Sequence, residues 1–401
     1  MALDPSVPAA RQGPAPDELS AWLQLLETPG LGRQGARRLL AAFGDPAAVL
    51  AAGPTGWRGI VDSAALQGLQ HPPAAIGTLV QRTLDWLAQA ADRHIVVLGD
   101  PLYPTALLES PDPPLLLYAI GRLSLLQRPS LAIVGSRHPT AQGNETARSF
   151  AQALGTAGIT VVSGLAAGID AAAHEGALDV PAHERSARRA DRPGSTIAVV
   201  GTGLDRIYPR SNRELALHIA ERGLLLSEFS LGTPPLAQNF PQRNRIIAGL
   251  SLGTLVVEAA LQSGSLITAR LASEAGREVF AVPGSIHAPQ SRGCHALIKQ
   301  GAKLVEEIDD ILAELRLAQV PSTTLAVSGS TELIEAPTQP PGDDADDAVL
   351  SALGWSAATL DVLQVRTGLS SSELVVRLLT LELEGSVARL PGELFQRVVR
   401  A

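Results

Sequence analysis

Lysine is the scarcest basic residue in this 401-residue sequence. Only Lys299 and Lys303 occur, and arginine supplies the remaining positive charges. A phosphate-binding loop of the form GxxxxGK[ST] needs a lysine to reach the phosphates, and neither lysine stands in such a motif. The sequence therefore argues against a nucleotide-hydrolysing motor.

Cysteine and long apolar runs are also scarce. Cys294 is the only cysteine, which rules out an internal disulfide framework and fits a reducing compartment. No segment has about 18 uninterrupted apolar residues, and the N-terminal stretch lacks the apolar region of a signal peptide. We therefore expect a cytoplasmic protein without a membrane partner.

Positive charge is missing from one long segment. The formal net charge of −8 argues against a generally basic nucleic-acid-binding protein. However, no basic residue lies between Arg316 and Arg366, where the acidic residues are Glu332, Glu335, Asp343, Asp344, Asp346, Asp347 and Asp361. Without that segment the chain is close to neutral, so a local positive groove is compatible with the sequence.

Composition divides the chain into five sections. Residues 1–16 are rich in proline and alanine and are predicted to be a disordered tail. Residues 17–90 have the pattern of short helices, and residues 91–316 alternate apolar runs with helical stretches. Residues 317–345 are predicted to be an acidic, Pro-rich linker. The order of elements in residues 346–401, two helices and a short strand pair, resembles a winged helix.

The helical section contains a glycine-rich hairpin, TPGLGRQGARRLLAAFG, from Thr28 to Gly44. It resembles a helix-hairpin-helix unit, in which Gly30 and Gly32 would let backbone N–H groups approach a phosphate. A plain helical hairpin with a glycine-rich turn has the same pattern. The sequence leaves both interpretations open.

Eight short and mostly apolar runs are predicted to be strands covered on both faces. They are Ile95–Leu98, Leu115–Ala119, Leu131–Val134, Thr160–Val162, Thr196–Val200, Leu224–Ser227, Thr254–Val257 and Glu278–Val282. Helical stretches separate most of the later runs, which indicates βαβ units. The predicted fold class is α/β, with an extended Rossmann-like, doubly wound and mainly parallel sheet.

Polar loops follow several of these strands. GSR occupies Gly135–Arg137, SGLAAGID occupies Ser163–Asp170 and GTGLDRIYP occupies Gly201–Pro209. In an open α/β sheet, ligands bind beyond the carboxyl ends of the strands, at such loops and at helix N-termini. These three loops are therefore the candidate binding loops.

The segment FPQRNRIIAGLS follows them. It places Arg243 and Arg245 around Asn244, three residues after the aromatic Phe240. Forked guanidinium donors, an amide and a ring suit a strand of nucleic acid. The same run could also be a helix start whose arginines extend into solvent.

Three other patterns resemble catalytic or cofactor sites, and each is weak. Arg206 replaces the third glycine of a dinucleotide fingerprint. Asp170 and His174 share one helix face but lack a third metal ligand, which favours a structural hydrogen bond. Cys294 and His295 are neighbours without an orienting carboxylate, so a nucleophilic role is disfavoured.

The stronger enzymatic alternative involves Glu258. Gly253 and Thr254 followed by Glu258 resemble the loop of Rossmann-like phosphoribohydrolases that cleave nucleoside monophosphates. Those enzymes have a fuller double-glycine phosphate loop, which Leu252 interrupts here. This function is kept as the alternative.

Together the motifs resemble the DprA (Smf) family of DNA-processing proteins. The matching motifs, in the order of the family, are YPTALLESPDPPLLLYAIG (103–121), GSR (135–137), SGLAAGID with AH (163–174), GTGLDRIYP (201–209), SEF (227–229), FPQRNRIIAGLS (240–251), VVEA (256–259), SGSLITA (263–269) and AVPG (281–284). The similarity is strong over residues 95–315 and weaker in the flanking sections.

The resemblance implies binding without turnover. Such proteins bind single-stranded DNA in a pocket of the Rossmann-like domain, form homodimers through that domain and load RecA onto incoming DNA during natural transformation, with no cofactor or metal. The positions that match the DNA-contacting motifs, or extend them, are Gly135, Ser136, Arg137, Ser163, Gly164, Arg206, Arg210, Phe240, Arg243, Asn244 and Arg245. Helix N-termini at the first two loops are expected to add backbone donors, and Phe240 a stacking platform.

Two segments depart from the family pattern. Residues 179–195 form an unusually long insertion, and its arginines could extend the DNA track or belong to a solvated loop: Arg185, Arg188, Arg189 and Arg192. The second helix of the winged section is the candidate recognition helix, and it carries one basic residue, Arg377, and three acidic residues, Glu373, Glu382 and Glu384. Because those acids repel phosphate, we expect a protein contact there rather than groove binding.

Overall fold

The computed structural model describes residues 13–180, 195–315, 348–355, 357–390 and 392–397. Most of the predicted tail, the four arginines of the long insertion and the predicted linker lie outside the described residues. Within the described ranges, no helix is long and apolar enough to cross a membrane.

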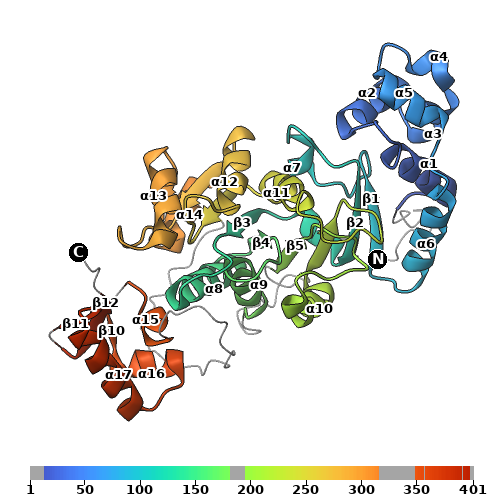
Figure 1. Ribbon diagram of the computed structural model, residues 1–401. Helices are drawn as coiled ribbons and strands as arrows, with labels where there is room; N and C mark the ends of the chain where they lie inside the picture. The colour runs from blue at the N-terminus through green and yellow to red at the C-terminus, as the bar shows by residue number, and fades with distance from the viewer. Residues whose placement is uncertain (1–12, 181–194, 316–347, 356, 391, 398–401) are drawn as a thin grey trace, which may run out of the picture.

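Six helices precede the sheet (Figure 1). They are α1 (Pro16–Leu26), α2 (Arg33–Phe43), α3 (Pro46–Ala51), α4 (Gly53–Trp57), α5 (Ser63–Gln70) and α6 (Ile76–Ala88). Their apolar side chains form a core that continues onto the first two strands. Trp86 of α6 meets Tyr118 of β2 edge to face, with ring centroids 5.9 Å apart.

A nine-stranded sheet forms the centre of the molecule, in the order β1-β2-β6-β5-β4-β3-β7-β8-β9. The strands are β1 (Arg93–Val97), β2 (Leu116–Gly121), β3 (Ser130–Val134), β4 (Thr160–Ser163), β5 (Thr196–Val199), β6 (Leu224–Ser227), β7 (Gly253–Val256), β8 (Glu278–Ala281) and β9 (Lys303–Leu304). All neighbouring pairs from β6 to β9 are parallel, whereas β1 and β2 add an antiparallel end. The predicted doubly wound, mainly parallel sheet is confirmed, and the strand order reverses between β3 and β7.

Helices cover both faces of this sheet. One face carries α8 (Ala141–Thr156), α9 (Ile169–Leu178), α10 (Arg213–Arg222) and α14 (Ile308–Glu314), and the other carries α7 (Thr105–Leu108), α11 (Asn239–Leu250), α12 (Ser265–Glu274) and α13 (Arg292–Lys299). Side chains alternate accordingly along β3: Leu131 and Ile133 pack in the core under α8 and α9, and Ala132 and Val134 in the core under α11. Burial on both faces explains why the strands read as continuous apolar runs.

A small winged-helix domain ends the described chain. It contains α15 (Ala348–Leu353), β10 (Ala358–Thr359), α16 (Leu360–Thr367), α17 (Ser371–Leu383), β11 (Val387–Leu390) and β12 (Leu394–Arg397). Its three strands pair in the order β10-β12-β11. Ser370 and Glu373 form a reciprocal capping box that starts α17. The predicted helix, turn, helix and strand pair is confirmed.

Candidate nucleic-acid site

The candidate loops meet the first turn of α11 at the carboxyl ends of β3, β4 and β5. The side-chain amide of Asn239 donates to the carbonyl of Gly201 at 3.0 Å. A Cβ on Gly201 would lie 3.2 Å from the Phe240 ring, so glycine lets the ring pack on this loop. The N–H of Ile169 donates to the carbonyl of Ser136 at 3.1 Å. These contacts join loops that are distant in the sequence into one surface.

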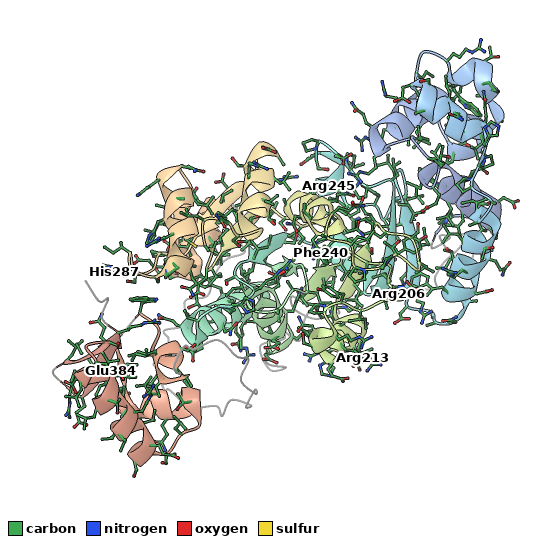
Figure 2. The ribbon with its side chains drawn as sticks, viewed as in Figure 1. Arg206, Arg213, Phe240, Arg245, His287 and Glu384 are labelled. Carbon is green, nitrogen blue, oxygen red and sulfur yellow. The ribbon has the colours of Figure 1, made fainter. Side chains whose placement is uncertain are left out.

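The centre of this surface is a group of three side chains. The Arg137 guanidinium carbon lies 5.8 Å from the centroid of the Phe240 ring. On the same ring, Tyr208 packs at a centroid distance of 5.6 Å and an interplanar angle of 43°. Tyr208 is 45% exposed, so its ring remains open to a planar ligand. Figure 2 shows Phe240 near the middle of the molecule.

Tyr208 was absent from the residues predicted from sequence. Its neighbours Arg206 and Arg210 are among those residues, whereas this tyrosine of the GTGLDRIYP motif, which lies between them, is not. The signal available was the tyrosine–proline pair in a loop that follows a buried strand. Only the fold brings that pair against a ring of α11.

Two further exposed arginines, Arg206 and Arg210, lie two residues before and two residues after Tyr208 in the chain. Arg137, Arg206 and Arg210 are all exposed to solvent. Asn244, half-buried, lies four residues after Phe240 and therefore on the same face of α11. Guanidinium groups, rings and an amide thus share one surface, which is a combination suited to phosphates and stacked bases.

Arg243 is placed differently from the expectation that it faces a ligand. Its side chain points inward, and the residue is only 4% exposed. One guanidinium nitrogen donates to the carbonyls of Gly164 and Val199 at the ends of β4 and β5. Burial, opposed by Asp170 and reinforced by Arg137, lowers the pKa of Arg243 to about 10. Arg243 therefore holds α11 to the sheet.

Arg245 points away from that surface, into a network that joins the N-terminal helices to the core. It forms ion pairs with Glu228, which follows β6, and with Asp112, whose Oδ2 lies 3.1 Å from the arginine Nε. Asp112 also pairs with Arg33 at 2.9 Å and Arg37 at 2.5 Å, both on α2. Burial opposes ionisation of Asp112, but the arginines, Arg245 foremost, lower its pKa.

The SGLAAGID loop uses its own donors internally. Asp170 accepts the N–H groups of Gly164 at 3.1 Å and Ala166 at 3.4 Å. The N–H of Leu165, a residue with φ of +57°, donates to His174 Nε2 at 3.2 Å. The expectation that this loop offers backbone donors to phosphate is therefore wrong for these three N–H groups, because the side chains of Asp170 and His174 on α9 already accept their hydrogen bonds.

Ser163 and Gly164 are also inside the protein. Ser163 is fully buried, and its hydroxyl donates to the carbonyl of Ile133 at 2.6 Å. A Cβ at Gly164 would lie 2.3 Å from the guanidinium of Arg243. Both residues support the site from beneath rather than line it.

Asp170 and His174 have the structural role that the sequence favoured. His174 Nδ1 lies 2.7 Å from the hydroxyl of Thr196, which itself donates to the carbonyl of Val161 at 2.8 Å. His174 Nδ1 is therefore the donor and Nε2 the acceptor. Burial lowers the pKa of His174 to about 3, so the ring is neutral at physiological pH. Across the described ranges, no group of His, Cys, Asp and Glu residues is arranged to hold a metal ion.

The Glu258 alternative loses its geometric basis. Gly253 and Thr254 are buried inside β7 at its amino end, whereas Glu258 follows the carboxyl end. A strand of this length separates them by about 13 Å, so they cannot form one phosphate loop. Glu258 instead accepts the N–H and hydroxyl of Thr140, the N-cap of α8, at 3.0 and 2.6 Å.

Cys294 is equally unsuited to catalysis. It is fully buried, and its thiol lies 3.6 Å from the carbonyls of Val256 and Val257. Burial raises the pKa of Cys294 to about 12, so the thiolate is not formed near neutral pH.

The glycine-rich hairpin between α1 and α2 is tightly packed on one side. Gly30 has φ of +77°, and a Cβ there would lie 2.9 Å from the backbone of Ala64 on α5. At Gly32, by contrast, no atom lies within 4 Å of an added Cβ. Gly30 thus serves the packing of its own domain, and phosphate contact by this hairpin stays a prediction.

Sequence comparisons agree with this architecture. Residues 94–316, more than half of the chain, match the family described as DNA recombination-mediator protein A. The chain belongs to the DprA/Smf family. Residues 334–393 match the DprA winged helix domain of the same family.

Individual relatives support this assignment, and one alignment is longer than the sheet domain. Protein Smf of Escherichia coli is 44% identical over 321 residues, which cover 78% of this chain and 79% of the relative. DNA processing protein DprA of Streptococcus pneumoniae is 48% identical over 215 residues, or 54% of this chain and 72% of that protein. The crystal structure of Streptococcus pneumoniae DprA superposes with a TM-score of 0.60 at 36% identity, covering 75% of this chain and 98% of that chain.

Proposed function

We propose that this protein binds single-stranded DNA without turnover, in the cytoplasm, and that Arg137, Phe240, Tyr208 and Asn244 form the centre of the binding surface. The observation that carries the proposal is the packing of Arg137 and Tyr208 on the Phe240 ring, at 5.8 and 5.6 Å. Rings stack on bases irrespective of sequence, and arginine both pairs with phosphate and stacks. The surface thus suits a single strand, whose bases are accessible.

The exposed residues Arg206 and Arg210 flank Tyr208 in the chain and act in this proposal as additional phosphate contacts. Loop residues Gly135 and Ser136 are half-buried next to Arg137. A Cβ on Gly135 would lie 2.7 Å from the Ile169 side chain, so this glycine lets the loop that holds Arg137 pack against α9. Arg243, Ser163 and Gly164 act in this proposal as supports, because they are buried. Arg245 acts through the network with Asp112 and Glu228.

The wider role that we propose follows the family: the protein protects incoming DNA and loads RecA during natural transformation. A homodimer formed through the Rossmann-like domain is part of this proposal. Sedimentation equilibrium on the full chain tests the dimer, and adding purified RecA to the DNA complex in a gel shift tests loading.

The decisive experiment is fluorescence anisotropy of labelled oligo-dT with the full chain. Arg137→Ala is expected to weaken binding and to reduce the slope of log K against log salt by about 0.7, the value for one phosphate contact. The matched control is Arg270→Ala, an exposed arginine on α12 that pairs with Glu274. Equal affinities of wild type and Arg137→Ala would refute the site. Release of free base from nucleoside monophosphates would refute the absence of catalysis.

A further inference from the structure

Helix α17 is apolar on two opposite sides. One side is buried in the core of the winged domain and contains Leu374, Leu378 and Leu381. The other side is exposed to solvent, although it carries four branched apolar side chains: Val375 (50% exposed), Val376 (67%), Leu379 (55%) and Leu383 (82%). We call these four residues the α17 apolar face.

The α17 apolar face is a continuous stripe. At about 100° per residue, its four positions fall within an arc of about 100° on the helix. That arc is as wide as the stripe by which an amphipathic helix normally packs on a core. A contiguous exposed apolar surface is typical of an interaction site, whereas single exposed apolar side chains are common on any protein surface.

The winged domain contacts the core through other residues. Arg366 of α16 pairs with Glu145 of α8 at 3.0 Å. Trp355, just after α15, lies against His287 with ring centroids 6.5 Å apart. Figure 1 shows α17 on the side of the winged domain that faces away from the large sheet. The contacts of this domain with the core therefore leave the α17 apolar face accessible.

Acidic side chains border the stripe on both sides. By helical position, Glu382 lies along one border, and Glu373 and Glu384 lie along the other. These charges repel phosphates, so the face does not suit a nucleic-acid groove. A second copy of α17 is also a poor fit, because a twofold axis in either orientation brings acidic borders together.

We propose that the α17 apolar face is a docking surface for a partner protein, which inserts an amphipathic helix whose apolar stripe is flanked by lysine or arginine. Such a helix covers the valines and leucines and places a basic side chain opposite each acidic border. The proposal is independent of the single-stranded DNA site, since no residue of that site contributes to it. According to this proposal, the winged domain binds a partner protein rather than double-stranded DNA.

The test uses two labelled model peptides of about 18 residues with the same leucine stripe. One is flanked by lysine and the other by glutamate, and their binding to the full chain is measured by fluorescence anisotropy. Wild type is expected to bind the lysine peptide at least about tenfold more tightly than the glutamate peptide, and less so as salt rises. The double variant Val376→Glu, Leu379→Glu is expected to lose that binding, although its added negative charge would strengthen a non-specific attraction.

The matched control is Ile286→Glu, which adds the same charge at a 74% exposed site of the Rossmann-like domain. It is expected to bind the lysine peptide as wild type does. Leu383→Glu, at an 82% exposed position, repeats the test if the double variant folds poorly by circular dichroism. Equal peptide binding by wild type, these variants and the control would overturn the proposal. So would a wild-type dimer that the substitutions convert to monomer in sedimentation velocity, because a second copy would then be the occupant.

Discussion

Arg243 and Arg245 are two residues apart on α11 and point to nearly opposite sides of it. In a helix, positions i and i+2 are about 200° apart. Arg243 accordingly reaches the strand-end carbonyls of Gly164 and Val199, and Arg245 reaches Glu228. The two arginines anchor α11 on both sides and so fix the direction of Phe240. Both arginines of the motif therefore hold α11 in position and do not themselves face the binding surface.

Substitution of Arg243 should therefore affect stability before binding. Arg243→Ala is expected to lower the free energy of unfolding by about 3–5 kcal/mol, because it leaves the buried Asp170 without its charge partner. Urea denaturation followed by circular dichroism measures this. Arg137→Ala, at an exposed position, is the control and should change stability by less than about 0.5 kcal/mol. A stable Arg243→Ala protein with reduced DNA binding would instead make Arg243 a direct contact.

Tyr208 should contribute stacking to the DNA complex. Tyr208→Leu is expected to weaken oligo-dT binding about 5- to 100-fold, as expected for the loss of one stacked base. Tyr208→Phe keeps the ring and should bind within about twofold of wild type. Quenching of 2-aminopurine placed in the oligonucleotide reports the stacking directly. Equal affinity of the leucine and phenylalanine variants would show that no base uses this ring.

Asp112 should connect the N-terminal helices to the core. Asp112→Asn removes the charge that attracts Arg33, Arg37 and Arg245, and is expected to cost about 1–3 kcal/mol. Hydrogen exchange should then rise in α2 and at the start of α11. The control is Glu109→Gln, a 64% exposed carboxylate that pairs with Arg277. Unchanged exchange in α2 would indicate that apolar packing alone holds the domains together.

His174 should make stability fall in acid. Its pKa is lowered to about 3 in the folded state, from an ordinary value of 6.5. The folded protein therefore binds fewer protons than the unfolded chain below pH 6.5. The contribution is fully present above pH 6.5 and is lost progressively towards pH 3.

Between pH 6.5 and 4.5 this loss should amount to about 2–3 kcal/mol. His174→Gln removes the titrating group and keeps an amide that can both donate and accept. Its stability should depend less steeply on pH than that of wild type over the same range. Denaturant midpoints at half-unit pH steps make the comparison, and parallel curves would contradict the role of His174.

The amino-acid sequence alone was enough to predict the α/β class, the positions of eight strands, the loops at their carboxyl ends and the winged helix. These features are encoded locally, in apolar runs, helical spacing and capping residues such as Ser370. The family motifs and their order along the chain could be recognised in the same way. The weak hydrolase pattern around Glu258 illustrates the limit, because spacing along the chain does not say which residues lie inside a strand.

Which polar residues face outward could not be predicted from the sequence, because it depends on how the elements pack. Ser163 and Arg243 belong to motifs that predict binding. Both side chains are nevertheless buried, and they donate hydrogen bonds to backbone carbonyls at the ends of neighbouring strands. Tyr208 reaches Phe240, 32 residues later, only because the sheet brings β5 beside the start of α11. Local patterns specify elements, whereas the direction and burial of a side chain depend on packing partners that are distant in the sequence.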